Sequence, residues 1–170
     1  MLFRSFVNDV TKYADQQNLD PAIVLGLIRR ESVFDPGARS AAGAIGLMQI
    51  MPQTGVTIAE RLNEKWASAG SLYQTDVNVK YGSFYYKQML NKFGGHFALA
   101  AAAYNAGPGR VNQWLPHFRS VPADVWIETI PFKETREYVT AVLGYAIIYQ
   151  QRLNRDTLRA GDFMRDVTPG

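Results

Sequence analysis

The apolar residues of this 170-residue chain recur at helical spacing almost throughout, and the alternation typical of β-strands is scarce. This pattern predicts helices over residues 2–17, 21–32, 40–50, 52–63, 76–93, 96–105, 109–116 and 132–153. Glycine and proline separate these segments, because neither residue continues a helix well. We therefore predict an all-α fold with little or no β structure.

The helix predicted over residues 21–32 carries a carboxylate on its apolar face. Asp20 is a good N-cap, and Pro21 suits the first helical position. Glu31 falls near the helix C-terminus on the stripe formed by the aliphatic residues Ile23, Val24, Leu27 and Ile28. Burial and the helix dipole both disfavour the ionised carboxylate there, so we expect a raised pKa for Glu31.

A raised carboxyl pKa is what a general acid working near neutral pH requires. The alternative is a structural role, since a lone helical glutamate is usually solvated or paired with an arginine. The helix alone does not decide between these two interpretations of Glu31.

Length and composition predict one globular domain over residues 1–170, with a core over about residues 20–153 and a tail over about residues 154–170. The absence of cysteine excludes disulfides and thiolate metal sites but leaves the cellular compartment open. The net charge of +3 and the pI near 9.2 weakly favour an anionic partner, such as nucleic acid, a membrane surface or an acidic cell-wall polymer. No basic run exceeds two residues, which argues against a nucleic-acid-binding tail.

The N-terminal residues lack the long apolar core of a signal peptide. No run approaches the roughly 20 apolar residues of a membrane span. If the native protein is exported, we expect its targeting segment to be missing from this chain.

Three further stretches combine small residues with isolated polar groups. The segment predicted as a helix over residues 40–50 contains Gly43 and Gly46, which suggests close approach of another backbone, a ligand or a neighbouring helix. Its amide, Gln49, needs hydrogen-bond partners if it is buried. An alanine-rich helix ends at Tyr104-Asn105 before a sharp turn, and a short apolar stretch after residue 125 contains one carboxylate, Glu128.

These stretches follow one another in an order that resembles a known family. The matching motifs are Glu31-Ser32, Gly43 to Pro52, Ala103 to Val111, and Ile127 to Pro131 followed by Arg136 to Val139. The sequence resembles the catalytic domain of the soluble lytic transglycosylases, goose-lysozyme-like enzymes that cleave bacterial peptidoglycan. The resemblance implies a lysozyme-like fold with a substrate cleft.

The resemblance also implies a role for each matching residue. Glu31 matches the single catalytic acid/base of the family. Ser40 and Gln49 match groups that line the glycan cleft, with the serine near the substrate's N-acetyl group. The resemblance assigns further cleft positions to Met48 and Met51 as apolar wall, Tyr104 as the tyrosine accompanying the acid, Asn105 as support of its turn, Glu128 as a second acidic wall residue, and Tyr138 at the border. For Met48, Asn105 and Tyr138 a purely structural role stays open, because such positions at helical spacing are usually core.

The family mechanism implies cleavage of the β-1,4 bond between N-acetylmuramic acid and N-acetylglucosamine, with a 1,6-anhydromuramyl product. Glu31 serves in turn as acid and base, so neither a second carboxylate nor a cofactor is required. Two alternatives stay open: hydrolysis with help from Glu128, as in goose-type lysozyme, and a non-catalytic peptidoglycan-binding module.

Metal catalysis is not expected, because His96 and His117 form no helical metal pair and no acidic loop has EF-hand spacing. The expected partners are peptidoglycan glycan strands and other cell-wall enzymes, in the periplasm or the wider bacterial cell envelope. Many family members carry a large helical region before the catalytic domain, and we expect none in this chain.

Overall fold

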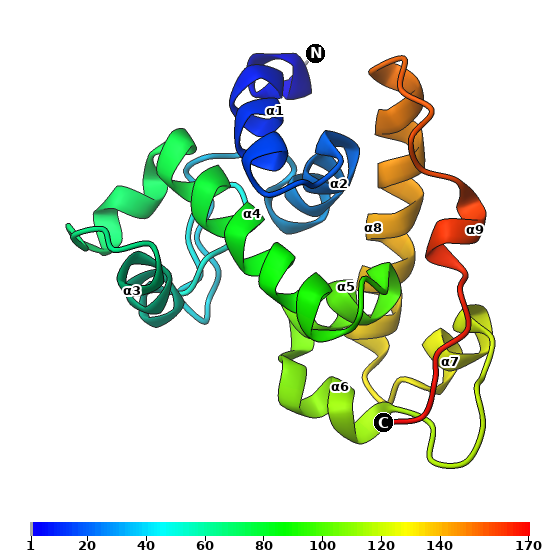
Figure 1. Cartoon of the computed structure of the whole chain (residues 1–170). Coiled ribbons are helices and arrows are strands. Elements are labelled where there is room, and N and C mark those ends of the chain that lie inside the picture. The colour runs from blue at the N-terminus through cyan, green and yellow to red at the C-terminus, as the bar shows by residue number, and fades with distance from the viewer. Residues whose placement is uncertain (1) are drawn as a thin grey trace. The chain divides into compact units, whose positions relative to one another are not determined.

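Helices and turns make up the described part of the chain, residues 2–170 of a computed structural model (Figure 1). Within these residues there is no β-strand, and the extended pairings are three isolated antiparallel bridges: Arg39 with Ile45, Ile45 with Ile50, and Val121 with Val167. The all-α prediction is confirmed. The chain divides into two compact units, residues 1–85 and residues 86–170, and the prediction of one domain over residues 1–170 stays a prediction.

The first unit is organised around a buried helix. Its elements are η1 (Leu2–Ser5), α1 (Val7–Gln16), α2 (Pro21–Ser32), α3 (Pro52–Arg61), η2 (Ala69–Tyr73) and the first part of α4 (Thr75–Lys92). Helix α1 packs on α2, and α3 packs on η2. Every residue of α2 from 21 to 28 is buried, so this apolar helix forms much of the core of the first unit.

The second unit is built around an alanine-rich helix. It contains the end of α4, then α5 (Phe97–Ala106), α6 (Pro108–Trp114), α7 (Ala123–Thr129), α8 (Lys133–Arg152) and α9 (Ala160–Phe163). Helix α5 packs on α6, α8 and α9, and its buried alanines allow these neighbours to approach closely. Phe97 meets Phe163 edge to face, with ring centroids 5.2 Å apart, which fixes α9 on α5.

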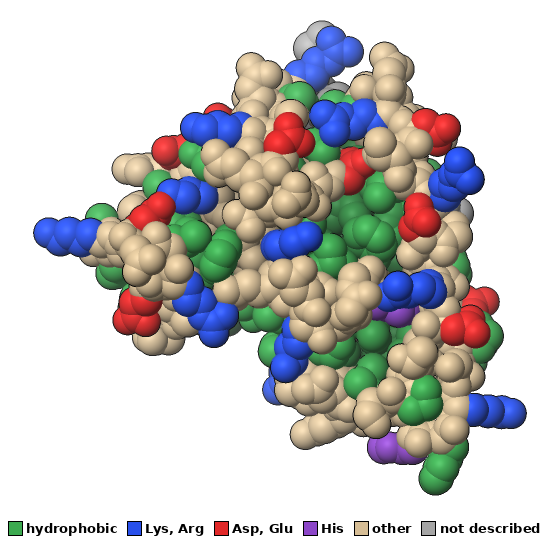
Figure 2. All heavy atoms as spheres, viewed as in Figure 1, with side chains coloured by type: hydrophobic (Ala, Val, Ile, Leu, Met, Phe, Trp, Pro, Cys, Tyr) green, Lys and Arg blue, Asp and Glu red, His purple; other side chains and the backbone are tan. Residues whose placement is uncertain are grey.

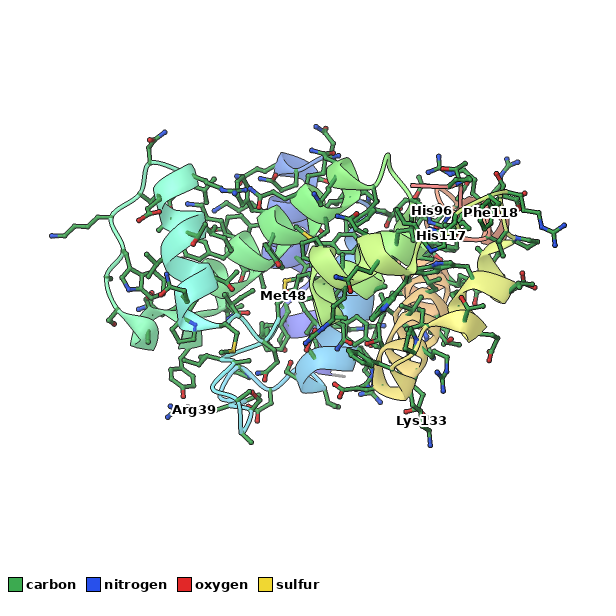
Figure 3. All side chains as sticks on the ribbon, turned by 90° about the horizontal axis from the view of Figure 1, so that it is seen from below. Arg39, Met48, His96, His117, Phe118 and Lys133 are labelled. Carbon is green, nitrogen blue, oxygen red and sulfur yellow. The ribbon has the colours of Figure 1, made fainter. Side chains whose placement is uncertain are left out.

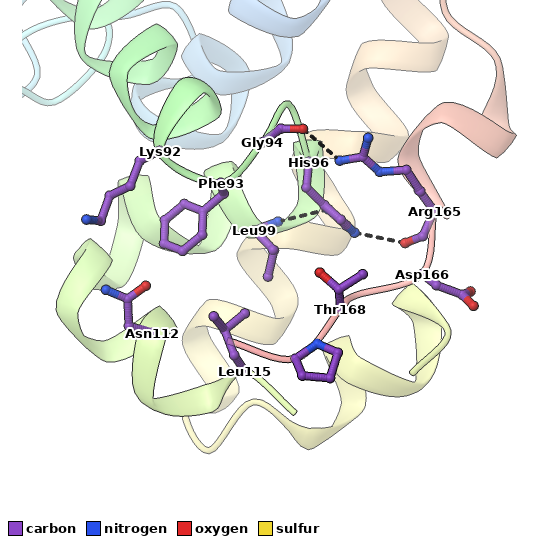
Figure 4. Close-up of a pocket in the computed structure, with 11 residues that line it drawn as sticks. Lys92, Phe93, Gly94, His96, Leu99, Asn112, Leu115, Arg165, Asp166 and Thr168 are labelled. Atoms are coloured by element: carbon purple, nitrogen blue, oxygen red, sulfur yellow. Dashed lines mark hydrogen bonds between the residues drawn. The ribbon is translucent and has the colours of Figure 1, made fainter. Parts of the chain in front are cut away.

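The C-terminal tail is tied to the second unit by backbone hydrogen bonds. Val121 and Val167 exchange two of them, at 2.9 and 2.8 Å. Figure 4 shows His96 in contact with Arg165, whose carbonyl oxygen accepts a 2.8 Å hydrogen bond from Nε2, while the Arg165 guanidinium donates to the Gly94 oxygen at 3.0 Å. The tail therefore wraps the second unit through residues 165–167.

Seven of the eight predicted helices are present with small shifts at their ends, and the segment over residues 2–17 is interrupted at Phe6. The helix predicted over residues 40–50 is wrong: this segment consists of turns and the bridges at Ile45. Gly43, Gly46 and Gln49 have φ angles of 94°, 80° and 51°, which no right-handed helix contains. The short elements η2, α7 and α9 were not predicted as helices.

Charged side chains of both signs are interspersed on the face shown in Figure 2, without an extended patch of one sign on this face of the described chain. The most exposed large apolar side chain among the described residues is Phe118, which is 98% exposed beside His117 (Figure 3). The net charge of +3 is therefore not gathered in one patch on this face.

Candidate active site

Glu31 lies in the last turn of α2, as the sequence predicts. The helix begins where Asp20 accepts a 2.8 Å hydrogen bond from the Ala22 amide and Pro21 takes the first position. Glu31 itself is half-buried, whereas the aliphatic stripe that precedes it is buried. A core helix thus presents one carboxylate at its C-terminal end.

The residue after Glu31 ties this helix end to a distant loop. The Ser32 hydroxyl lies 2.8 Å from the Leu47 carbonyl oxygen and 3.3 Å from the Ile28 carbonyl oxygen. Val33 and Phe34 then adopt left-handed backbone conformations, with φ of 54° and 65°. Such conformations are costly for a β-branched residue and persist only where surrounding contacts impose them. The hydrogen bonds of Ser32 and the constrained backbone of Val33 and Phe34 therefore hold the chain directly after Glu31.

The segment between α2 and α3, residues 33–51, is folded on itself by hydrogen bonds. The Ala38 oxygen accepts from the Gly46 amide at 2.8 Å and from Gln49 Nε2 at 3.3 Å. Gln49 Nε2 also donates to the Gly46 oxygen at 2.9 Å. Because both bonds use the nitrogen, the side-chain oxygen of Gln49 keeps its acceptor capacity.

Asn78 on α4 binds the same segment through hydrogen bonds of its side chain. Its Nδ2 donates to the Ile45 and Leu72 oxygens, both at 2.8 Å, and its Oδ1 accepts from the Met48 amide at 2.7 Å. The side chain is buried (1% exposed), so each of these bonds satisfies a group that water cannot reach. Asn78 is not among the predicted site residues, although an amide on the inward face of a helix is a signal that the sequence contains.

The predicted glycan contacts of the first unit fall into two groups. Ser40 is exposed, and its hydroxyl accepts a 3.0 Å hydrogen bond from the Ala44 amide; Met51 is 40% exposed at the start of α3. Met48, in contrast, has no exposed surface and packs against Gly82, where an added Cβ would lie 2.7 Å from Met48 Cβ. Met48 (labelled in Figure 3) is therefore a core residue of this structure rather than part of an exposed wall.

In the second unit, Tyr104 and Asn105 lie in the last turn of α5, as predicted. The half-buried Tyr104 ring lies 6.3 Å from the ring of Tyr86, whose pKa is raised by burial. Asn105 Oδ1 accepts a 2.7 Å hydrogen bond from the Thr135 hydroxyl on α8. This bond ties the end of α5 to the start of α8, and the predicted support of its turn by Asn105 stays a prediction.

Glu128 is exposed on α7, a helix the sequence analysis described only as a short apolar stretch. It lines a shallow hollow of about 250 Å³ together with residues of α7, α8 and the tail. Tyr138 is 2% exposed and belongs to the core of the second unit, so its predicted place at the border of a cleft has no exposed surface to support it. In the first unit, Ser40 and Gln49 thus lie in one hydrogen-bonded segment, to which Ser32 of α2 also binds. In the second unit, Asn105 of α5 is hydrogen-bonded to α8.

Three further observations concern metal binding, a second hollow and membrane helices. The described residues contain no cluster of three His, Cys, Asp or Glu side chains that could hold a metal ion. A hollow of about 570 Å³ borders His96 and the tail (Figure 4), but none of the predicted site residues lines it. Among the described helices, none has the length and apolar character needed to cross a membrane.

Comparison with known proteins places these features in a family. The family model described as the transglycosylase SLT domain matches residues 9–127, and the model described as the soluble lytic transglycosylase helical domain matches residues 129–157. The second match follows the first and covers α8, the helix predicted over residues 132–153, so it does not test the expectation about a helical region before the catalytic domain.

Curated relatives and solved structures agree with the family models. The soluble lytic murein transglycosylase of Salmonella typhimurium is 36% identical over 146 residues, which cover 84% of this chain and 23% of that protein. The chain therefore spans about a quarter of the length of the soluble lytic murein transglycosylases it matches.

Two solved structures share the fold. An inactive Glu-to-Gln variant of the lytic transglycosylase Slt from Pseudomonas aeruginosa has a TM-score of 0.86 and 42% identity, covering 93% of this chain and 26% of that chain. The 70 kDa soluble lytic transglycosylase from Escherichia coli has a TM-score of 0.86 and 31% identity, covering 94% and 26% respectively. This chain belongs to the transglycosylase SLT domain family.

Proposed function

We propose that this chain is a peptidoglycan lytic transglycosylase that cleaves the β-1,4 bond between N-acetylmuramic acid and N-acetylglucosamine. The observation that carries the proposal is Glu31 at the end of a core helix, tied through Ser32 to the loop of residues 33–51. Membership of the SLT domain family supports the reaction class. Glu31 is the single acid/base of the proposed mechanism.

In one turnover Glu31 donates one proton and accepts one, so it ends in the protonation state in which it began. Protonated Glu31 donates to the glycosidic oxygen, the bond from this oxygen to the muramyl anomeric carbon breaks, and N-acetylglucosamine departs with the proton. The muramyl N-acetyl carbonyl stabilises the cationic carbon, and the C6 hydroxyl of the same sugar then attacks it. Glu31 accepts the hydroxyl proton, which leaves a 1,6-anhydromuramyl end. Intramolecular attack is favoured over capture of water because the attacking hydroxyl belongs to the bound sugar, so no second molecule has to lose its freedom of movement.

The other site residues support binding in this proposal. Ser40 and Gln49 offer a hydroxyl hydrogen and an amide oxygen to the N-acetyl and hydroxyl groups of the glycan, and Met51 offers an exposed apolar surface. Tyr104 and Glu128 are proposed as further glycan-binding groups. We assign Met48 and Tyr138 to packing, because both are buried.

Hydrolysis is the second candidate reaction. Glu128 is an exposed carboxylate that could activate water if it reached the anomeric carbon. A non-catalytic peptidoglycan-binding module is the third candidate, and Glu31 argues against it, because binding alone does not call for a carboxylate at the end of a core helix.

The experiment is mass spectrometry of the products released from purified peptidoglycan. Muropeptides one water lighter than hydrolysis products and resistant to borohydride are expected from the wild-type chain. Glu31→Gln should abolish their release while glycan binding persists, and the exposed, charge-matched Glu60→Gln should behave as wild type. Reducible muramyl ends would establish hydrolysis instead, and substantial turnover by Glu31→Gln would refute the role of Glu31.

We further propose that the chain acts in the periplasm of a bacterial cell envelope, on glycan strands and beside other cell-wall enzymes. The soluble lytic murein transglycosylases among its relatives support an envelope substrate. Fractionation of cells expressing the native gene, followed by detection with an antibody, tests this location.

A further inference from the structure

The tight turn over residues 45–50, which we call the Gln49 turn, carries an amide that the proposed function assigns to the glycan. Ile45 and Ile50 exchange two backbone hydrogen bonds of 3.0 Å, and the backbone amide of Gln49 donates to the Gly46 oxygen at 3.1 Å. Gln49 has a φ angle of 51°, a left-handed conformation that a non-glycine residue keeps only where its surroundings impose it. The place of the Gln49 side chain therefore depends on what holds this turn.

One side chain of α4 holds the Gln49 turn at two points. Asn78 Nδ2 donates to the Ile45 oxygen at 2.8 Å, and Asn78 Oδ1 accepts from the Met48 amide at 2.7 Å. The second hydrogen of Nδ2 goes to the Leu72 oxygen, also at 2.8 Å, which joins the turn to η2. Because Asn78 is 1% exposed, water cannot replace any of these partners. A planar amide that both donates and accepts fixes the orientation of the turn as well as its distance from α4.

Two glycines let the turn and α4 approach this closely. A Cβ atom added to Gly46 would lie 2.8 Å from Asn78 Cγ, so a side chain there would push Asn78 away. Gly82 lies one helical turn after Asn78 on the same face of α4, and Met48 (Figure 3) fills the space above it. Met48 has no exposed surface, and its Cβ would lie 2.7 Å from a Cβ added to Gly82. The face of α4 formed by Asn78 and Gly82 thus fits the Gln49 turn through both hydrogen bonds and shape.

A second anchor joins the Gln49 turn to the helix of the proposed acid. The hydroxyl of Ser32, the residue after Glu31, lies 2.8 Å from the Leu47 oxygen in the middle of the turn. Both anchors belong to the first unit, so Asn78 on α4 and Ser32 on α2 together determine where the turn lies beside Glu31. Loss of one anchor would let the turn shift about the other.

We propose that Asn78 is a positioning residue, which sets the place of the Gln49 amide oxygen relative to Glu31 through its hydrogen bonds to the Gln49 turn. Gln49 Nε2 donates to the Gly46 and Ala38 oxygens, at 2.9 and 3.3 Å, so the side chain moves with the turn while its oxygen can accept from the glycan. The inference rests on the proposed function, because Gln49 meets a glycan only in that proposal.

The test is a double-mutant cycle between Asn78→Ser and Gln49→Ala, measured as kcat/KM for anhydromuropeptide release. Serine is too short to reach the partners of Asn78, and we expect a loss of about tenfold in kcat/KM, the size of one hydrogen bond. In the Gln49→Ala background the same substitution should cost less than about twofold, because the group that Asn78 positions is absent. A purely structural role would give equal losses in both backgrounds.

Three matched measurements separate positioning from stability. Asn91→Ser makes the same substitution at an exposed place on α4, and Ile58→Val removes a buried methyl group from α3; both should keep the wild-type kcat/KM. Circular dichroism at the assay temperature verifies that each variant is folded. The cycle is repeated in the Glu31→Gln chain as affinity for soluble, uncrosslinked glycan strands, which that chain binds without cleavage in the proposed function.

Asn78→Asp gives an independent readout in a side chain of the same shape. It keeps the acceptor for the Met48 amide but sets a carboxylate against the Ile45 and Leu72 oxygens. Burial and these two oxygens raise the pKa of the introduced carboxyl, and its proton restores one donor in acid. The kcat/KM of Asn78→Asp relative to the wild type should therefore rise between pH 7 and pH 5, whereas the ratio for Asn78→Ser should stay constant.

Equal losses from Asn78→Ser with and without the Gln49 side chain would overturn the proposal, as would wild-type kcat/KM in both Asn78 variants. Failure of the proposed reaction is seen separately, as reducible products or no products from the wild-type chain. In that case the affinity cycle in the Glu31→Gln chain still decides the role of Asn78, because it requires no turnover. A chain that neither cleaves nor binds the glycan would overturn both proposals.

Discussion

At the scale of single residues, the chain directly after Glu31 is held by the three residues that follow it. The chain turns away from α2 through Val33 and Phe34, whose left-handed conformations cost about 1–3 kcal/mol each. Phe34 is buried (3% exposed), and its ring stacks on Phe6 at 6.1 Å, which offsets part of this cost. Ser32 adds a hydrogen bond at the same point, so rigidity is concentrated beside the proposed acid.

Ser32→Ala should reduce turnover more than binding. The substitution removes the hydroxyl that lies 2.8 Å from the Leu47 oxygen and leaves that buried acceptor without its partner. We expect a loss of about 1–3 kcal/mol in the free energy of unfolding. We also expect kcat to fall about tenfold with KM little changed, because a small displacement of a catalytic group is costly. Anhydromuropeptide release and urea unfolding measure the two effects.

Ser32→Thr keeps the hydroxyl and should recover most of the lost kcat, while Ser120→Ala at an exposed position should change neither quantity. Wild-type kcat in Ser32→Ala would show that the hydrogen bond does not position Glu31. A parallel fall in kcat for both Ser32 variants would point to packing rather than to the hydroxyl.

The sequence predicted residues whose signal is local and missed those whose partners are remote. Glu31 could be found because its stripe and the helix cap lie within one segment. Ser32 and Asn78 could not be assigned roles, because their hydrogen bonds reach carbonyl groups 15 and 33 residues away. For Met48 the choice between apolar wall and a structural role stayed open for the same reason: nothing local reveals that Gly82 makes room for its side chain.

At the scale of elements, the segment over residues 33–51 shows why glycine can mislead a helix prediction. Its apolar residues recur at a spacing that also fits a chain of tight turns, in which Ile45, Leu47 and Ile50 all point inward. At Gly43 and Gly46 the sequence predicts close approach of another backbone, a ligand or a neighbouring helix. Gly46 does approach the Leu72 backbone, but both glycines also supply positive φ angles, of 94° and 80°, that a helix does not contain. Length and apolar spacing alone do not separate these two cases.

Gly46→Ala should strongly destabilise the first unit. An added Cβ would lie 2.5 Å from the Leu72 oxygen and closer still to Asn78 Nδ2, at a φ angle that side chains avoid. We expect the free energy of unfolding to fall by about 2–4 kcal/mol, because both backbone strain and overpacking contribute. Urea denaturation followed by far-UV circular dichroism measures the loss.

Gly144→Ala is the matched control, since it lies within α8 with nothing near an added Cβ. Alanine should raise the free energy of unfolding there by about 0.5–1 kcal/mol. If Gly46→Ala were as stable as the wild type, the close approach of Asn78 and Leu72 to Gly46 would be refuted.

At the scale of the whole molecule, the tail joins elements that are far apart in sequence. His96 caps α5 by accepting from the Leu99 amide at 3.5 Å, and on its other side Nε2 donates to the Arg165 oxygen at 2.8 Å. The sequence predicts only that a tail begins at about residue 154. The buried imidazole of His96 and the edge-to-face contact of Phe163 with Phe97 both link it to α5.

This arrangement makes stability depend on pH. Burial, and then the nearby Arg165 charge, lower the pKa of His96 from its ordinary value of 6.5, although its backbone hydrogen bonds act in the opposite direction. The unfolded chain therefore binds a proton at a higher pH than the folded chain does. As the pH falls below 6.5 towards the lowered pKa, stability should decrease by at most about 1.4 kcal/mol per pH unit from this group.

Urea unfolding between pH 7.5 and pH 5 measures this slope, and two variants assign it. His96→Gln should be less stable at pH 7.5, because the cap and the Arg165 contact are weakened, yet its stability should fall less steeply below pH 6.5. His117→Gln removes an exposed imidazole and should keep the wild-type slope. If His96→Gln also kept that slope, protonation of His96 would not be the cause. The loss of stability in acid would then have to come from carboxylates, and the tail would be held independently of the charge on His96.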